Sequence, residues 1–179
     1  YLCKQLTEKM KNFILSIILI FSISLNANTD PNDFENLKQL EGKWIGTLER
    51  TNDTKDSFIL EFSVASNGSA ILEESNTGGV EMLTIFNYQN DELLLTHYCG
   101  LQNKPVSKLT SNVDGKLMFK TDSEMSGLSL KKDTYVTSWE IDLIPEDENK
   151  IHYKYTVSGP EGVSFLSLIH ISEPTRPID

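Results

Sequence analysis

The side chains that could carry chemistry gather in one stretch, residues 70–105. They are an acid, a histidine, a phenol, a thiol and an amide: Glu73, His97, Tyr98, Cys99 and Asn103. His97 could act as a general base, ligate a haem iron or hydrogen-bond the polar end of a bound molecule. It could also be a core histidine that a carboxylate, Glu73 or Glu81, satisfies. The residues alone leave these interpretations open.

Alternation within ELLLTHYC divides the side chains of this strand between two faces. One face holds Leu93, Leu95, His97 and Cys99, and the other holds Leu94, Thr96 and Tyr98. Both faces begin with apolar residues, so alternation does not select the interior. Cys3 lies outside the expected mature chain, which leaves Cys99 as a lone thiol and favours a buried position for it. We therefore expect the His97 and Cys99 face to point inward.

Neither a thiol nucleophile nor a metal site is predicted. On one face of a strand, His97 and Cys99 lie roughly 7 Å apart, twice the strand rise, which is too far for a direct hydrogen bond. His152 is expected to face outward with Lys154 and Thr156, away from other ligands. The sequence contains no zinc-ligand spacing, phosphate-binding loop or nucleophile elbow. No catalytic residue or metal ligand is therefore assigned.

Short alternating segments separated by turns predict β-structure along most of the chain. A short helix is expected from Pro31, ended by Gly42. The expected strands cover residues 43–50, 57–65, 70–75, 80–88, 92–99, 106–113, 116–121, 135–144 and 151–157. Successive hairpins of this kind favour a single antiparallel up-and-down β-barrel of about 8–10 strands. A β-sandwich is the alternative.

Both ends of the chain differ in character from the middle. Residues 10–27 combine Lys11, an apolar run and small residues, which is typical of a secretory signal peptide, with residues 1–9 as upstream translation. An uncleaved membrane anchor is the alternative, although a span needs about twenty apolar residues. Residues 166–179 resemble translated sequencing-adapter sequence and are expected to be a non-native tail. A genuine strand over residues 163–171 is the alternative.

The region between these ends, residues 28–165, is long enough for one domain with a sizeable core. The whole chain has 26 acidic and 16 basic residues, a net charge of −10. Such a surface repels phosphate backbones, so nucleic acid is not an expected partner. With a cleaved signal peptide, the domain is expected in the periplasm or secreted, without a stable membrane anchor. Nothing in the sequence indicates its oligomeric state.

Several of these segments resemble a group of uncharacterised bacterial proteins with a lipocalin-like (calycin) β-barrel. They are GSAILEES at 68–75, VEMLTIFNY at 80–88, and LTHYC followed by Asn103 and Pro105. The opening FENLKQLEGKWIGT is similar to the start of calycins, including the haem-binding nitrobindin-like barrels. The resemblance covers residues 34–121 and implies a lipocalin-like barrel fold, but it implies no particular activity, because the group has no agreed function. It departs from the expected Asn-Gln-Pro at Lys104.

These observations predict a barrel that binds a small, mainly apolar ligand. The candidate ligand-binding residues are His97, Tyr98, Cys99, Glu73, Asn103 and Trp44. No cofactor is expected, although the resemblance leaves haem possible. Two alternatives remain: a structural or interaction domain with a filled core, and a barrel enzyme that uses His97 as a general base.

Overall fold

The computed structural model describes residues 30–143 and 150–172, with only the backbone described for residue 150 and residues 164–172. The expected signal peptide, residues 10–27, and the upstream residues 1–9 lie outside the described residues. Of the expected tail, residues 166–172 belong to the last strand and residues 173–179 lie outside the described residues.

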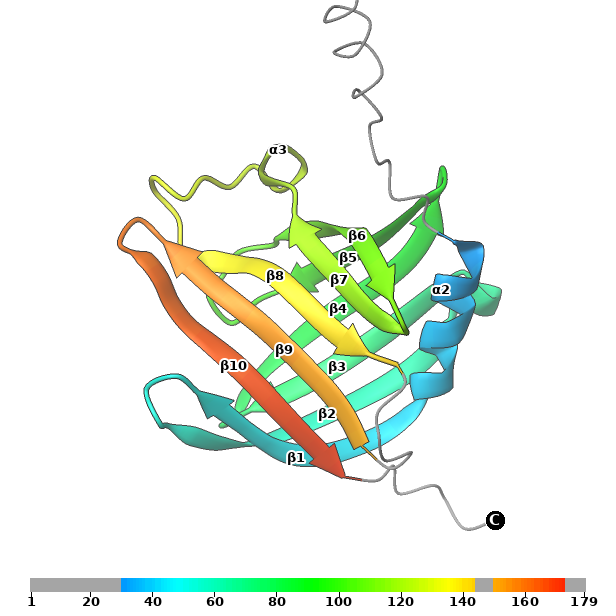
Figure 1. The fold of residues 1–179 in the computed structure, drawn as a ribbon, viewed down its shortest axis with the longest axis horizontal. Helices are drawn as coiled ribbons and strands as arrows, with labels where there is room; N and C mark the ends of the chain where they lie inside the picture. Colours follow the sequence, from blue (N-terminus) through cyan, green and yellow to red (C-terminus); the bar gives the residue numbers. More distant parts are fainter. Residues whose placement is uncertain (1–29, 144–149, 173–179) are drawn as a thin grey trace, which may run out of the picture.

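Ten antiparallel strands form a closed barrel (Figure 1). They are β1 (Gly42–Arg50), β2 (Lys55–Ala65), β3 (Ala70–Thr77), β4 (Val80–Gln89), β5 (Glu92–Tyr98), β6 (Val106–Val113), β7 (Lys116–Thr121), β8 (Tyr135–Asp142), β9 (Lys150–Gly159) and β10 (Gly162–Ser172). Each strand pairs with its neighbours in sequence, and β10 pairs with β1. The predicted all-β barrel of about 8–10 strands is confirmed, and the sandwich is not observed.

Tight turns fix how the strands pair. Asn90 and Asp91, between β4 and β5, both have positive φ angles, as do Asp114 and Gly115 between β6 and β7. Positive φ at both central residues is the signature of the two-residue turn whose twist suits a hairpin. Such a turn fixes the register of its two strands, and with it the residues that face each other across the hairpin.

One short helix, α2 (Pro31–Leu37), lies at the barrel end where β6 turns into β7 (Figure 1). Asp30 caps it, with its Oδ1 accepting from Asn32 N at 2.9 Å. Asp33 is buried and accepts a hydrogen bond from Asn112 Nδ2 of β6 at 2.6 Å. A 3-10 turn, η1 (Lys38–Leu40), then leads into β1, where Trp44 Nε1 donates to Leu40 O at 2.8 Å. The helix and the turn that follows it are thus each hydrogen-bonded to the barrel.

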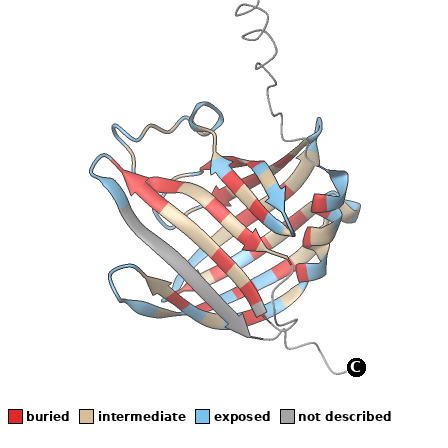
Figure 2. Cartoon of the chain, in the orientation of Figure 1, coloured by how far each residue is buried: buried red, intermediate tan, exposed pale blue. Residues whose placement is uncertain are grey.

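The interior near α2 is filled with side chains. Phe86 lies between Phe62 and Phe119, at centroid distances of 6.5 Å and 6.0 Å. Phe34 and Leu37 bring the apolar face of α2 into the same core cluster. Figure 2 shows the resulting alternation of buried and less buried residues along the strands.

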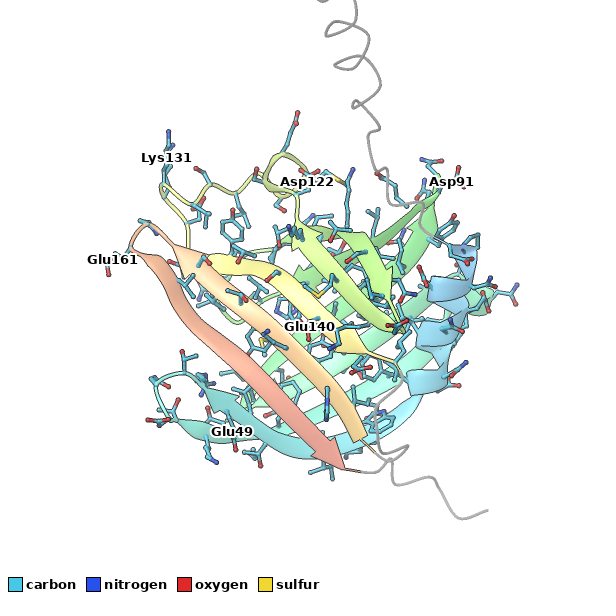
Figure 3. All side chains as sticks on the ribbon, in the orientation of Figure 1. Glu49, Asp91, Asp122, Lys131, Glu140 and Glu161 are labelled. Carbon is cyan, nitrogen blue, oxygen red and sulfur yellow. The ribbon has the colours of Figure 1, made fainter. Side chains whose placement is uncertain are left out.

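The opposite end carries the longer connections. They include a single helical turn, α3 (Ser123–Ser126), in which Ser126 Oγ accepts a hydrogen bond from Val106 N at 2.8 Å. Charged side chains labelled in Figure 3, such as Glu161 and Lys131, stand on loops at this end. No helix within the described part of the chain is long and apolar enough to cross a membrane.

We expect Leu37→Ala to destabilise the fold by about 2–5 kcal/mol, because it removes a fully buried side chain from the junction of α2 and the barrel. Urea unfolding would measure this loss. The exposed Gln39 supplies the matched control, and Gln39→Ala should change the midpoint little. Equal midpoints for the two variants would contradict a structural role for α2.

Candidate ligand cavity

A cavity of about 240 Å³ lies inside the barrel, toward the end opposite α2. Its rim comes from strand ends and turns, with Arg50, Thr77, Val80 and Leu101. Its walls are mainly aromatic and aliphatic, and they are formed by Phe58, Val136, Trp139, Tyr155 and Val157. The buried polar residues of the lining are Glu73, Ser75, Thr77, His97 and Tyr153. The site is therefore an apolar chamber with a small polar group in its wall.

The polar group is a chain of hydrogen bonds across four strands. Glu73 on β3 accepts from Tyr153 OH on β9 at 2.6 Å, through its Oε2. Its other oxygen, Oε1, lies 3.1 Å from the hydroxyl of Thr84 on β4. The same Thr84 hydroxyl lies 2.9 Å from Nδ1 of His97 on β5. Both carboxyl oxygens and one imidazole nitrogen are thus engaged within the protein.

Strand register explains why these side chains meet. Glu73 stands directly opposite Thr84 in the β3–β4 pair, and Thr84 stands directly opposite His97 in the β4–β5 pair. Directly opposed residues of an antiparallel pair point to the same face with Cβ atoms about 4.5–5.5 Å apart. The side chains of Glu73, Thr84 and His97 therefore form one row across three strands and all point into the interior.

The second imidazole nitrogen, Nε2, has a different environment. Among the described residues, the His97 imidazole has a hydrogen-bond partner only at Nδ1, so Nε2 is the nitrogen left for the cavity that the ring lines. Trp139 packs edge-on against the ring, at a centroid distance of 4.9 Å. Thr84 and Trp139 together hold the imidazole in one orientation.

Burial shifts the protonation equilibria of this group in opposite directions. Glu73 is completely enclosed, and the loss of hydration raises its pKa from 4.5 to about 7, against the lowering effect of its hydrogen bonds from Tyr153 and Thr84. Loss of hydration lowers the pKa of His97 from 6.5 to about 4. The imidazole is therefore neutral around pH 7, where the acid titrates. Burial together with the nearby Glu73 raises the pKa of Tyr153 well above its usual range, so its hydroxyl keeps its proton.

Only some of the predicted site residues line the cavity. Glu73, His97 and Cys99 all line the cavity, and the inward orientation expected for the His97 face is observed. Cys99 is half-buried at the rim, and burial raises the pKa of its thiol. Tyr98 is 47% exposed and points away from the interior.

The other two candidates lie apart from the cavity. Trp44 is buried near α2, in the filled half of the barrel. Asn103 belongs to the loop after β5, where its Nδ2 donates to Thr134 O at 2.9 Å. Its Oδ1 is buried without a hydrogen-bond partner among the described residues. Asn103 thus joins two loops at the open end of the barrel.

Two members of the polar group, Thr84 and Tyr153, were not predicted from the sequence. Thr84 could have been found by counting residues back from the β3–β4 and β4–β5 turns, which places it opposite both Glu73 and His97. Tyr153 gave no such signal, because it reaches Glu73 from the other side of the barrel. Within the described residues, no group of three or more histidine, cysteine or acidic side chains could hold a metal ion.

Comparison with known proteins adds to the description of the fold. No known protein family matches the chain, and no curated protein matches it. Among solved structures, the chain is similar to a protein of unknown function from the DUF3598 family of Nostoc punctiforme, with a TM-score of 0.53 and 13% identity. The match covers 83% of this chain and 50% of that one, so the chain spans half the length of its neighbour. At this identity the likeness shows the fold alone, and the lipocalin-like and nitrobindin-like resemblance gains no further support.

The opposed pKa shifts predict how stability depends on pH. The folded protein binds the Glu73 proton more tightly than the unfolded chain, so this residue's contribution to stability falls as pH rises from about 4.5 to about 7. His97 acts in the opposite sense, because its lowered pKa makes stability rise between about pH 4 and 6.5. The contributions of Glu73 and His97 to stability therefore change in opposite directions over the pH range that they share.

Glu73→Gln removes the loss of stability with rising pH that Glu73 causes, and leaves the contribution of His97 in place. The amide keeps an acceptor for Tyr153 and a donor for Thr84. When the pH is raised from 5 to 8, we expect the free energy of unfolding of the variant to increase by about 2–3 kcal/mol relative to that of the wild type. Urea unfolding at the two pH values measures this change. Glu74→Gln, at the exposed neighbouring position, is the control and should show little of it. Parallel pH profiles for Glu73→Gln and wild type would refute a buried, titrating Glu73.

Proposed function

We propose that the barrel binds a small, mainly apolar molecule in its cavity and holds one polar atom of that molecule through Nε2 of His97. The observation that carries this proposal is a buried imidazole, fixed in orientation by Thr84 and Trp139, with one nitrogen left for a mainly apolar cavity. A concave apolar site with a few polar groups is the usual form of a small-molecule site.

The volume of the cavity bounds the size of the ligand. At about 240 Å³ it lies below the range of about 300–1,000 Å³ typical of pockets for drug-sized molecules. This favours a compact molecule, such as one with a single aromatic ring or a short branched chain, over a haem or a long fatty acid. The cavity also weighs against a uniformly filled core at this end of the barrel.

The lining also contains unsatisfied polar atoms. Trp139 Nε1 and Thr77 Oγ1 are buried, and neither has a hydrogen-bond partner among the described residues. An unmade hydrogen bond of this kind costs about 1–3 kcal/mol, which proteins usually avoid. Both residues line the cavity, so these unmade hydrogen bonds lie beside the proposed ligand site.

A barrel enzyme is the second candidate function, favoured by the hydrogen-bonded chain from Glu73 through Thr84 to His97. In such an enzyme, His97 Nε2 would accept a proton from the substrate. Recovery of the bound molecule in unchanged form after long incubation would support a binding protein, and its conversion would support the enzyme.

The expected signal peptide supports a place of action outside the cytoplasm.

Filling the cavity should weaken binding. Val157 is buried and lines the chamber, so Val157→Phe should lower the affinity for indole or acetophenone at least about tenfold. Val113 is 63% exposed on β6, and Val113→Phe is the control for the added ring. Ligand-observed NMR titration measures both affinities, and circular dichroism confirms that the variants are folded.

Two results would decide against ligand binding in this cavity. One is undiminished binding by Val157→Phe. The other is the failure of every compact probe to bind the wild type, together with native mass spectra that show no co-purifying molecule.

A further inference from the structure

The hydroxyl of Thr84 has one hydrogen and two neighbours that compete for it. Glu73 Oε1 lies at 3.1 Å and His97 Nδ1 at 2.9 Å, both within hydrogen-bond distance. A hydroxyl donates one hydrogen bond and accepts others. Whichever neighbour receives the hydrogen, the other must supply a hydrogen of its own to the Thr84 oxygen.

The protonation of Glu73 settles this competition. Ionised Glu73 can only accept, so Thr84 donates to it and His97 must carry a hydrogen on Nδ1. Neutral imidazole has one hydrogen, so Nε2 then presents a lone pair to the cavity. Protonated Glu73 can donate from Oε1 to Thr84, whose hydroxyl turns to Nδ1. The imidazole hydrogen is then on Nε2 and points into the cavity.

We propose that Thr84 couples the protonation of Glu73 to the tautomer of His97, so that the cavity offers ligands a hydrogen-bond donor in mildly acidic solution and an acceptor in mildly alkaline solution. This inference rests on the proposed function for its ligands, and on the Glu73, Thr84 and His97 geometry for the switch itself. It defines two ligand classes for one cavity: apolar molecules with a carbonyl-type acceptor, and apolar molecules with an N–H or O–H donor.

The proton has a defined route through the group. A proton from solvent binds Nε2, the Nδ1 proton passes to the Thr84 oxygen, and the Thr84 hydroxyl proton passes to Oε1 of Glu73. One proton enters, and one is gained by the carboxyl. His97 is neutral before and after, in agreement with its lowered pKa, and the acid has its pKa of about 7 in the range where the switch must act.

The other ionisable groups around the cavity leave this mechanism intact. Tyr153 donates to the second oxygen of Glu73 and can do so in either protonation state. Tyr155 and Cys99 also line the cavity, and burial raises the pKa of the Cys99 thiol. Arg50, at the rim, is paired with the carboxylate of Asp56. Among the described lining residues, Glu73 is therefore the acid that changes charge near neutral pH.

The tautomer itself can be measured without a ligand. Nitrogen-15 NMR distinguishes the two forms of a neutral imidazole, and a His97→Gln variant identifies the signal of His97 among the three histidines. In the wild type we expect protonated Nε2 at pH 5.5 and protonated Nδ1 at pH 8.5, with the change following the carbon-13 titration of Glu73. An unchanged tautomer across this range would overturn the proposal.

Three variants test the coupling. Thr84→Val should leave the tautomer independent of pH, and Thr84→Ser should restore the dependence by restoring the hydroxyl. In Glu73→Gln, the amide oxygen accepts from Tyr153 and the amide nitrogen donates to Thr84, so this variant should hold the hydrogen on Nε2 of His97 at every pH. Thr121→Val is the matched control, because Thr121 also bridges two partners, Ser107 and Val136 O, but lies outside the cavity lining. A pH-dependent tautomer in Thr84→Val would overturn the proposal.

Binding of paired probes tests the consequence for ligands. Indole offers only a donor, and indene has the same shape without it; acetophenone offers an acceptor that isopropenylbenzene lacks. From pH 5.5 to 8.5, we expect the affinity for indole to rise and that for acetophenone to fall, each by about tenfold, roughly the effect of one hydrogen bond. Both hydrocarbons should bind equally at the two pH values.

Glu73→Gln and Thr84→Val should remove the pH dependence for indole and acetophenone. Binding of all four probes without any pH dependence would overturn the switch while leaving the proposed function standing. Absence of binding with a pH-dependent tautomer would refute the proposed function and support the switch. The NMR measurement therefore decides the inference in either case.

Discussion

A closed barrel sends every second side chain of each strand into one shared interior. A polar residue at an inward position therefore cannot reach bulk water, and it must be satisfied by other inward residues. Glu73, Thr84 and His97 meet this requirement along a single cross-strand row. Because the row crosses three strands, the register of two hairpins is also what brings the acid, hydroxyl and imidazole together.

The same requirement explains how a carboxyl can be tolerated inside the barrel. Both oxygens of Glu73 have partners, Tyr153 and Thr84, and the loss of hydration favours the protonated form. The neighbouring imidazole responds to burial in the opposite direction and loses its charge. The result is a site that is largely uncharged in mildly acidic conditions and carries a single negative charge in mildly alkaline conditions, without a compensating cation in contact with it among the described residues.

Local patterns predicted the fold well because each hairpin carries its own information. Alternation marked the strands, and turns such as Asp114-Gly115 marked their ends; the strands 106–113 and 116–121 were predicted with their observed limits. The inward orientation of His97 followed from the argument about a lone Cys99. Contacts across the barrel carried no such local signal, so the bond from Tyr153 to Glu73 was missed. Tyr98, which shares its strand with His97, points outward, and Trp44 lies in the half of the interior that is filled.

The packing of the interior divides the barrel into two zones. Around α2, aromatic rings fill the space, Asn112 holds the helix and Trp44 holds the turn that follows it. At the other end, the cavity is bordered by turns and loops. Residues that determine folding are thus largely distinct from residues that would contact a ligand. In evolutionary terms, the loop end can accumulate substitutions that alter ligand preference while the helix end preserves the fold, so one scaffold can diversify across related proteins at little cost in stability.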